Sequence, residues 1–235
     1  MSCQLHLFGQ PRLLIAGEEV GLRPPLAYLV LVALAVGNRS QSRADIAKAL
    51  FPAVEPRERR AQLRIVLSQL RRRLIELGGE SLCRDDGSDL SLDDAVALDA
   101  WEVAAGQRIH PNRLWMYAQP VLVGCQSRFA NRCRGLVKNT IESSLPDCLA
   151  SCETPDSLWH LAPTLERLHT LYPLSATICA ARVSILRRLH LYQEATLAIA
   201  EFETEWVESF GSTDKPDIDS VARQLLPATP PEVRR

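Results

Sequence analysis

The chain has 235 residues, of which 46% are hydrophobic, 6% aromatic and 23% charged, and its formal net charge is −1. This is the composition of a soluble globular protein with enough apolar residues for one large or two ordinary domains; it excludes collagen-like, disulfide-scaffold and wholly disordered proteins. The near-zero total charge argues against a nucleic-acid partner.

The charge, however, is distributed unevenly along the chain. Residues 1–80 contain 12 basic and 7 acidic side chains, a net charge of +5, whereas the remainder contains 15 basic and 21 acidic side chains, a net charge of −6. Opposite charges on the two parts of a chain indicate nucleic-acid contact by the basic part. The total charge therefore does not exclude DNA.

Targeting, metal and catalytic signals are absent from the sequence. The N-terminus is not a secretory signal, and the longest apolar run, Leu26–Val36, is too short to cross a bilayer, so we expect a cytoplasmic protein without membrane contact. Seven cysteines form no C-x-x-C pair and no cluster with histidine, which predicts reduced structural thiols and neither metal nor cofactor. Nucleotide-binding and hydrolase motifs are also missing, so an enzyme is not expected.

The first 55 residues predict short strands followed by two helices. Apolar residues alternate with polar ones over residues 3–22, a pattern typical of strands. Pro24-Pro25 precede the apolar run Leu26–Val36, which suits the first turn of a helix that Gly37-Asn38 ends. Ser42 with Asp45 three residues later resembles a capping box, and it predicts a short helix that stops at Pro52.

A strongly amphipathic helix is predicted from Pro56 to about Leu77. One stripe of this helix is apolar: Leu63, Val66, Leu67, Leu70, Leu74 and Leu77. The opposite face collects Arg57, Ala61, Arg64, Ile65, Ser68, Arg71 and Arg72. Residues 81–92 then predict a β-hairpin with Asp86-Gly87 near its turn.

The rest of the chain is predicted to be almost entirely helical. Ala95–Ala105 is one candidate helix, and Arg113–Ser127 fits neither a helical nor a strand period. Further helices, in pairs joined by short turns as in tetratricopeptide repeats, are predicted over residues 128–150, 157–171, 175–189, 193–209 and 217–226. Four aromatic residues of these helices have the spacing of core residues, and we expect them to be buried: Trp159, Phe202, Trp206 and Phe210.

These elements predict a mainly α protein with two domains. An N-terminal winged helix-turn-helix with small β-sheets occupies residues 1–94, an all-α tetratricopeptide-like domain residues 95–226, and a frayed tail residues 227–235.

The arginine-rich helix is the most informative segment. An α-helix fits the major groove of B-DNA, where arginine can donate two hydrogen bonds to guanine, serine can read base edges and isoleucine can contact a thymine methyl group. The alternative is a solvated face of i,i+4 ion pairs, but only Glu58 and Glu76 are available as intrahelical partners. The spacing therefore favours nucleic acid, and the lack of interleaved aromatic residues favours duplex over single-stranded DNA.

Several segments resemble the SARP-type bacterial transcriptional activators. The segments at the front are Leu5–Gly9, Arg23–Pro25, Ser42–Pro52 and, above all, Leu63–Arg72. Those at the back, which resemble the family's bacterial transcriptional activator domain, are Tyr172–Leu174, Ala181–Leu189, Gln193–Ala195 and Phe210-Gly211. The resemblance covers about 90 residues at the front and about 60 at the back, and residues 107–155 depart from the family.

The resemblance implies an OmpR-like winged helix that binds double-stranded DNA as a homodimer on tandem sites, and a helical domain that recruits RNA polymerase holoenzyme. Residues 57–74 would be the recognition helix and 81–92 the wing. Arg57, Arg64, Ser68, Arg71 and Arg72 are the expected DNA contacts, Arg43 and Arg60 the expected phosphate partners, and Arg84 the candidate in the wing.

One feature of the wing departs from the family pattern. Asp85, Asp86 and Asp89 surround the single Arg84, and phosphates would repel these carboxylates. A second hypothesis is therefore an interaction scaffold, in which the acidic helical part binds a protein and the winged helix does not bind DNA.

Overall fold

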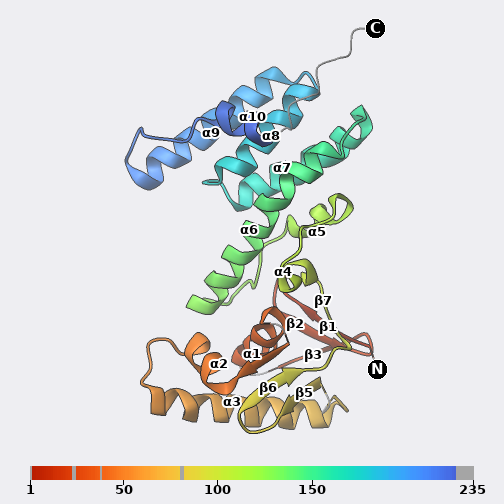
Figure 1. Cartoon of the computed structure of the whole chain (residues 1–235), viewed down its shortest axis with the longest axis vertical. Coiled ribbons are helices and arrows are strands. Elements are labelled where there is room, and N and C mark those ends of the chain that lie inside the picture. Colours follow the sequence, from red (N-terminus) through yellow and green to blue (C-terminus); the bar gives the residue numbers. More distant parts are fainter. Residues whose placement is uncertain (1, 23–24, 38, 80–81, 226–235) are drawn as a thin grey trace. The chain divides into compact units, whose positions relative to one another are not determined.

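A computed structural model describes residues 2–22, 25–37, 39–79 and 82–225 (Figure 1). The chain forms two compact units: the first comprises residues 1–107 and 120–137, and the second residues 108–119 and 138–235. The predicted domain boundary after residue 94, which separates a DNA-binding from an activator domain, remains a prediction. Arg23-Pro24, Asn38, Ser81 and the tail 227–235, which the sequence analysis used, lie outside the described residues.

The first unit contains two small sheets and the helices that pack on them. Its strands are β1 (Cys3–His6), β2 (Arg12–Ile15), β3 (Glu18–Val20), β4 (Ser40–Ser42), β5 (Cys83–Asp85), β6 (Asp89–Leu92) and β7 (Val96–Leu98). Its helices are α1 (Pro25–Val36), α2 (Arg43–Leu50), α3 (Pro56–Glu76), α4 (Trp101–Ala105) and the first part of α6 (Arg128–Ala150). The strands form sheets of order β3-β2-β1-β7 and β4-β6-β5.

The N-terminal sheet confirms the predicted strands over residues 3–22 and corrects one predicted helix. β1 pairs antiparallel with β2, while β7 pairs parallel with the other edge of β1, matching Cys3 with Val96 and Leu5 with Leu98. The expected helix over Ala95–Ala105 is therefore wrong in its first half, where a buried–exposed–buried strand precedes the short α4. The sequence pattern is too short to show this, because the partner strand is more than 90 residues away.

Helix α1 is the centre of the first unit. Nine consecutive residues, Ala27–Ala35, are buried, since the helix contacts α2, α3, α4 and β6. A helix that is apolar all round is expected in such a fully covered position. Tyr28 fixes the preceding segment, because its hydroxyl donates to the carbonyl of Val20 and accepts from the amide of Leu22.

The capping residue predicted for α2 is confirmed. The Oγ of Ser42 accepts a hydrogen bond from the amide of Asp45 at 3.1 Å and donates one to the Asp45 carboxylate at 2.7 Å. The helix thus begins at Arg43 with one of its orphan amides satisfied.

Replacing Ser42 by alanine is expected to lower the free energy of unfolding by about 1 kcal/mol, because the amide of Asp45 loses its acceptor. Urea denaturation followed by circular dichroism measures this. Ser209→Ala is the matched control, since Ser209 is exposed on a helix and caps nothing. Equal midpoints for the two variants would contradict the assignment.

The second unit is helical. Its elements are the 3₁₀ helix η2 (Pro111–Arg113), α5 (Leu114–Tyr117), the remainder of α6, α7 (Pro155–Leu171), α8 (Ala176–Arg188), α9 (Tyr192–Phe210) and α10 (Ile218–Leu225). All five helices predicted beyond residue 127 are present. Helix α8 contacts α7, α9 and α10, and its small buried residues Ala180, Ala181 and Ser184 allow this close packing. Successive helices joined by short turns give the predicted tetratricopeptide-like arrangement (Figure 1).

The predicted core aromatics of this unit are only partly buried. Phe202 is fully buried and Trp206 is half-buried, but Trp159 and Phe210 are 55% and 57% exposed, so placing them in the core was wrong. Helical spacing identifies a face, but which part of that face is covered depends on the neighbouring helices. Phe210 ends α9, and the following Gly211 adopts a left-handed conformation (φ +62°).

Residues 113–127 fit neither a helical nor a strand period. They contain α5 and then an irregular stretch, in which residues up to 119 belong to the second unit and residues from 120 belong to the first. Val121 forms a β-bridge with Phe8, and the Arg134 guanidinium donates to the carbonyls of Val121, Leu122 and Cys125.

Among the described residues, none of the helices combines the length and the apolar sequence that crossing a bilayer requires.

Candidate nucleic-acid interface

Helix α3 separates its apolar and basic residues as the sequence predicts. Leu63, Val66, Leu67, Leu70 and Leu74 are buried, and Leu77, just after the helix, is half-buried. The opposite face exposes Arg57, Arg60, Arg64, Ser68, Arg71 and Arg72. Because α3 has 21 residues, its basic face extends over about 30 Å.

Four of these arginines are available to a ligand. Within the described part of the chain, Arg57, Arg60, Arg64 and Arg72 form neither an ion pair nor a side-chain hydrogen bond. At about 100° per residue, Arg57, Arg60 and Arg64 lie close together on one side of the helix. Unpaired guanidinium groups in a row are suited to binding a polyanion, since each presents up to five donors.

Ile65 adds an apolar group to this basic face. Its side chain is 59% exposed, whereas its neighbours Val66 and Leu67 are almost completely buried. The predicted position of Ile65 on the solvent face is therefore confirmed, and its methyl groups are accessible to an apolar partner.

A hollow lies beside the N-terminal half of α3. It has a volume of about 310 Å³ and is lined by Arg43 and Ala44 from the start of α2, by Arg60, Leu63 and Arg64 from α3, and by Gly87 and Ser88 from the β5–β6 turn. Three arginines from two helices therefore converge on one concave surface. Its size and charge suit an anionic group such as a phosphate.

The hairpin β5–β6 is attached to this surface by Asp85. The side chain of Asp85 is 4% exposed, forms an ion pair with Arg43 at 3.1 Å and accepts a hydrogen bond from Arg71. Its other oxygen accepts from the amide of Gly87 at 2.9 Å, and Arg43 also donates to the Gly87 carbonyl at 3.3 Å. Asp85 therefore joins α2, α3 and the turn of the wing.

The sequence predicts Asp85 only as a charge that repels phosphate, and its pairing with the two arginines corrects this expectation. Because Asp85 neutralises part of the charge of Arg43 and Arg71, these two predicted DNA contacts are less available than Arg60 and Arg64. The only sequence signal for this pairing is an acidic residue in the hairpin after an arginine-rich helix. Such a signal does not show that its partners are Arg71 and Arg43, which lie 14 and 42 residues earlier in the chain.

The charged wing residues Arg84 and Asp86 are exposed. Arg84 has a side chain that is 73% exposed and lies 3.3 Å from Asp93. Asp86 organises the turn by accepting hydrogen bonds from the amides of Asp89 and Ser88, and the Asp89 amide is the main reason that its pKa is lowered. The predicted hairpin is confirmed for residues 83–92.

A second basic groove of about 540 Å³ lies on the other side of α2. Lys48 from α2, Arg59 from α3, and Arg128 and Arg132 from α6 line it, together with the single acid Asp45. Sequence reasoning did not find this groove, since Arg128 and Arg132 come from a segment about 80 residues further along the chain. It extends the positive charge of the first unit beyond α3.

The cysteines are buried, and their burial suppresses thiolate formation. All seven cysteines are free and buried, and burial raises the pKa of Cys3 and Cys83 to about 11 and that of Cys133 to about 12. Such thiols stay protonated and unreactive. Among the residues that the structure describes, no group of three His, Cys, Asp or Glu side chains could hold a metal ion.

Comparison with known proteins identifies the fold. No protein-family model and no curated protein matches the chain. The chain is similar to a solved structure of Mycobacterium tuberculosis EmbR in complex with a low affinity phosphopeptide, with a TM-score of 0.62 and 18% sequence identity. The match covers 95% of this chain and 64% of the EmbR chain. The chain therefore has the predicted fold, a winged helix with small sheets followed by a helical domain.

Proposed function

We propose that this protein is a transcriptional regulator that binds duplex DNA by placing α3 in the major groove. The observation that carries the proposal is the exposed row of unpaired arginines on α3, beside a hollow that three arginines line. The resemblance to SARP-type activators supports a role in transcription, and specifically in activation.

The geometry suggests a different role for each contact. Arg64, Ser68 and Ile65 lie on the exposed face of α3 and would read base edges, because arginine, hydroxyl and methyl groups each match a major-groove feature. Arg60 and Arg43 would hold a backbone phosphate in the hollow. Arg57, Arg71, Arg72 and the wing residue Arg84 would bind flanking phosphates.

The resemblance also supports the proposed partners. Residues 1–94 would bind DNA as one copy of a homodimer on tandem sites, and residues 95–226 would contact RNA polymerase holoenzyme. Chemical crosslinking on a DNA fragment with two sites tests the dimer, and co-purification with polymerase tests the second contact.

Binding is expected to depend steeply on salt. If each monomer engages four to six phosphates, log K falls against log[salt] with a slope of about −4 to −5 per monomer, because condensed counterions are released. Fluorescence anisotropy with a labelled promoter fragment over a range of salt concentrations measures this slope. A slope near zero, or no binding even at low salt, would contradict the proposal.

One observation favours the second hypothesis, an interaction scaffold. Asp85 occupies Arg43 and Arg71, so part of the basic surface is satisfied internally. If the protein is an interaction scaffold, it would fail to bind duplex DNA at low salt, and a protein partner would co-elute with it. The four unpaired arginines of α3 favour DNA over this alternative.

A further inference from the structure

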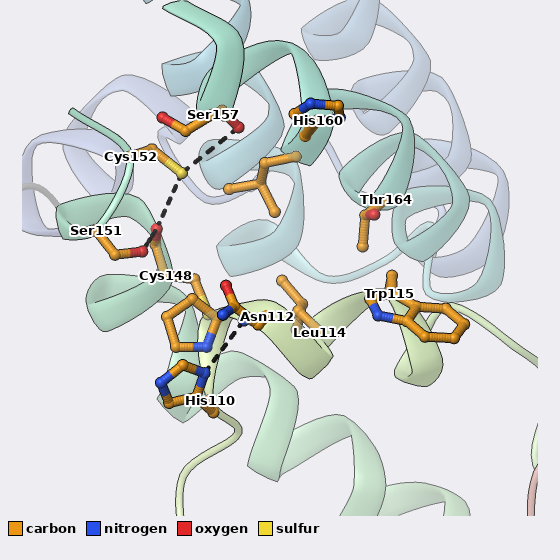
Figure 2. A pocket seen from close by; sticks show the side chains of 12 residues that line it. His110, Asn112, Leu114, Trp115, Cys148, Ser151, Cys152, Ser157, His160 and Thr164 are labelled. Carbon is orange, nitrogen blue, oxygen red and sulfur yellow. Dashed lines mark hydrogen bonds between the residues drawn. The ribbon is translucent and has the colours of Figure 1, made fainter. Parts of the chain in front are cut away.

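A hollow of about 550 Å³ lies within the second unit (Figure 2). Three segments enclose it: η2 with α5, the C-terminal end of α6, and one face of α7. Its α7 residues are Ser157, His160, Leu161 and Thr164, which share a face because they are three, four and seven positions apart. A hollow of this volume is in the range that binds drug-sized molecules.

The lining carries no permanent charge. It contains no Asp, Glu, Lys or Arg side chain. Nδ1 of His110 accepts a hydrogen bond from the amide of Asn112 at 3.3 Å, which leaves Nε2 to face a ligand. Burial raises the pKa of the Cys148 thiol to about 12, so that group is neutral. A charged ligand that entered this hollow would lose its hydration shell without gaining a counter-ion, which would weaken its binding.

Polar groups in the hollow are nevertheless available to a ligand. The hydroxyls of Ser151 and Ser157 already donate to backbone carbonyls at 2.8 and 2.7 Å. By contrast, within the described ranges no hydrogen bond is formed by the side chains of Asn112, His160 or Thr164. They provide both donors and acceptors, and Figure 2 shows them around the hollow on η2 and α7.

An aromatic surface completes the site. Trp115 of α5 lies at one side of the hollow with its indole 60% exposed, and its N–H forms no hydrogen bond with a described residue (Figure 2). A large exposed ring beside a concave surface is suited to stacking on a planar ligand. Leu114 and Leu161 add apolar contacts.

We propose that this hollow binds an uncharged planar heteroaromatic molecule, which stacks on Trp115 and forms hydrogen bonds with Asn112, His160 and Thr164. All of these residues belong to the second unit, so the site does not depend on the proposed DNA binding.

The probe for the test is 2-quinolone, a neutral bicyclic ring with an adjacent donor and acceptor, and the anionic comparison compound is quinoline-2-carboxylate. Each is titrated into the full chain labelled with ¹⁵N, and the indole Nε1–H resonances are followed by NMR. The Trp115 resonance is identified by its loss in Trp115→Ala. Trp159→Ala is the matched control, because Trp159 is equally exposed on α7 but does not line the hollow.

A saturable shift of the Trp115 resonance with 2-quinolone is expected, together with an affinity about tenfold lower in Trp115→Ala, read from backbone amides, and unchanged in Trp159→Ala. Thr164→Val, which removes the hydroxyl at nearly constant volume, should also weaken binding. The proposal is overturned if the shift does not saturate, if Trp115→Ala binds equally well, or if quinoline-2-carboxylate binds more tightly than 2-quinolone.

Discussion

Replacing Arg60 and Arg64 together by alanine is expected to weaken DNA binding by about 2–4 kcal/mol, or about 30- to 1000-fold. Arg64 would lose a base contact, and Arg60 a phosphate contact in the hollow. Both side chains are exposed and unpaired in the described chain, so the free energy of unfolding should change little. Fluorescence anisotropy with a promoter fragment measures the affinity.

Arg167→Ala is the control for the loss of a positive charge outside α3. Arg167 is an exposed arginine of α7, so its removal changes the net charge without affecting α3. The salt dependence provides a second measurement, because loss of the Arg60 phosphate contact should reduce the slope by about 1. If the double variant and the control bind equally well, the interface does not include Arg60 and Arg64.

Replacing Asp85 by alanine is expected to lower the free energy of unfolding by about 2–3 kcal/mol. The carboxylate is almost fully buried, forms an ion pair with Arg43 and accepts hydrogen bonds from Arg71 and the Gly87 amide, so all three groups lose a partner. The value is below that of a fully buried ion pair, because Arg43 and Arg71 are themselves 32% and 49% exposed and can rehydrate. Thermal and urea denaturation of the full chain measure the loss.

Hydrogen exchange locates the effect of Asp85→Ala. Amides of residues 83–92 should lose protection before those of α8, since Asp85 attaches the wing to α2 and α3. Asp94→Ala is the control, because Asp94 is 96% exposed and its contact with Arg39 is 3.7 Å long. Equal stability of the two variants would show that the Asp85 contacts do not hold the wing in place.

Much of the fold could be predicted from the sequence, because its signals are local. Ser42 with Asp45 marks the start of α2, the leucine spacing defines the buried face of α3, and Asp86-Gly87 marks the turn of the hairpin. The exposure of Arg57, Arg64, Ser68 and Ile65 follows from the same helical period. The sequence by itself therefore determined most of the helices, the hairpin and the composition of the basic face, but not β7 or α5.

Only the tertiary structure decided which of those basic groups are available. Asp85 pairs with Arg71 and Arg43, 14 and 42 residues away, and the hollow beside α3 combines three separate segments. The parallel pairing of β7 with β1 and the hollow beneath Trp115 likewise join residues that are distant in the chain. Helical and strand periods report only which face a residue occupies, whereas the opposing partner is set by packing of the whole chain. The net charge of −1 thus hides a basic surface, and the structure shows which of its arginines remain unpaired.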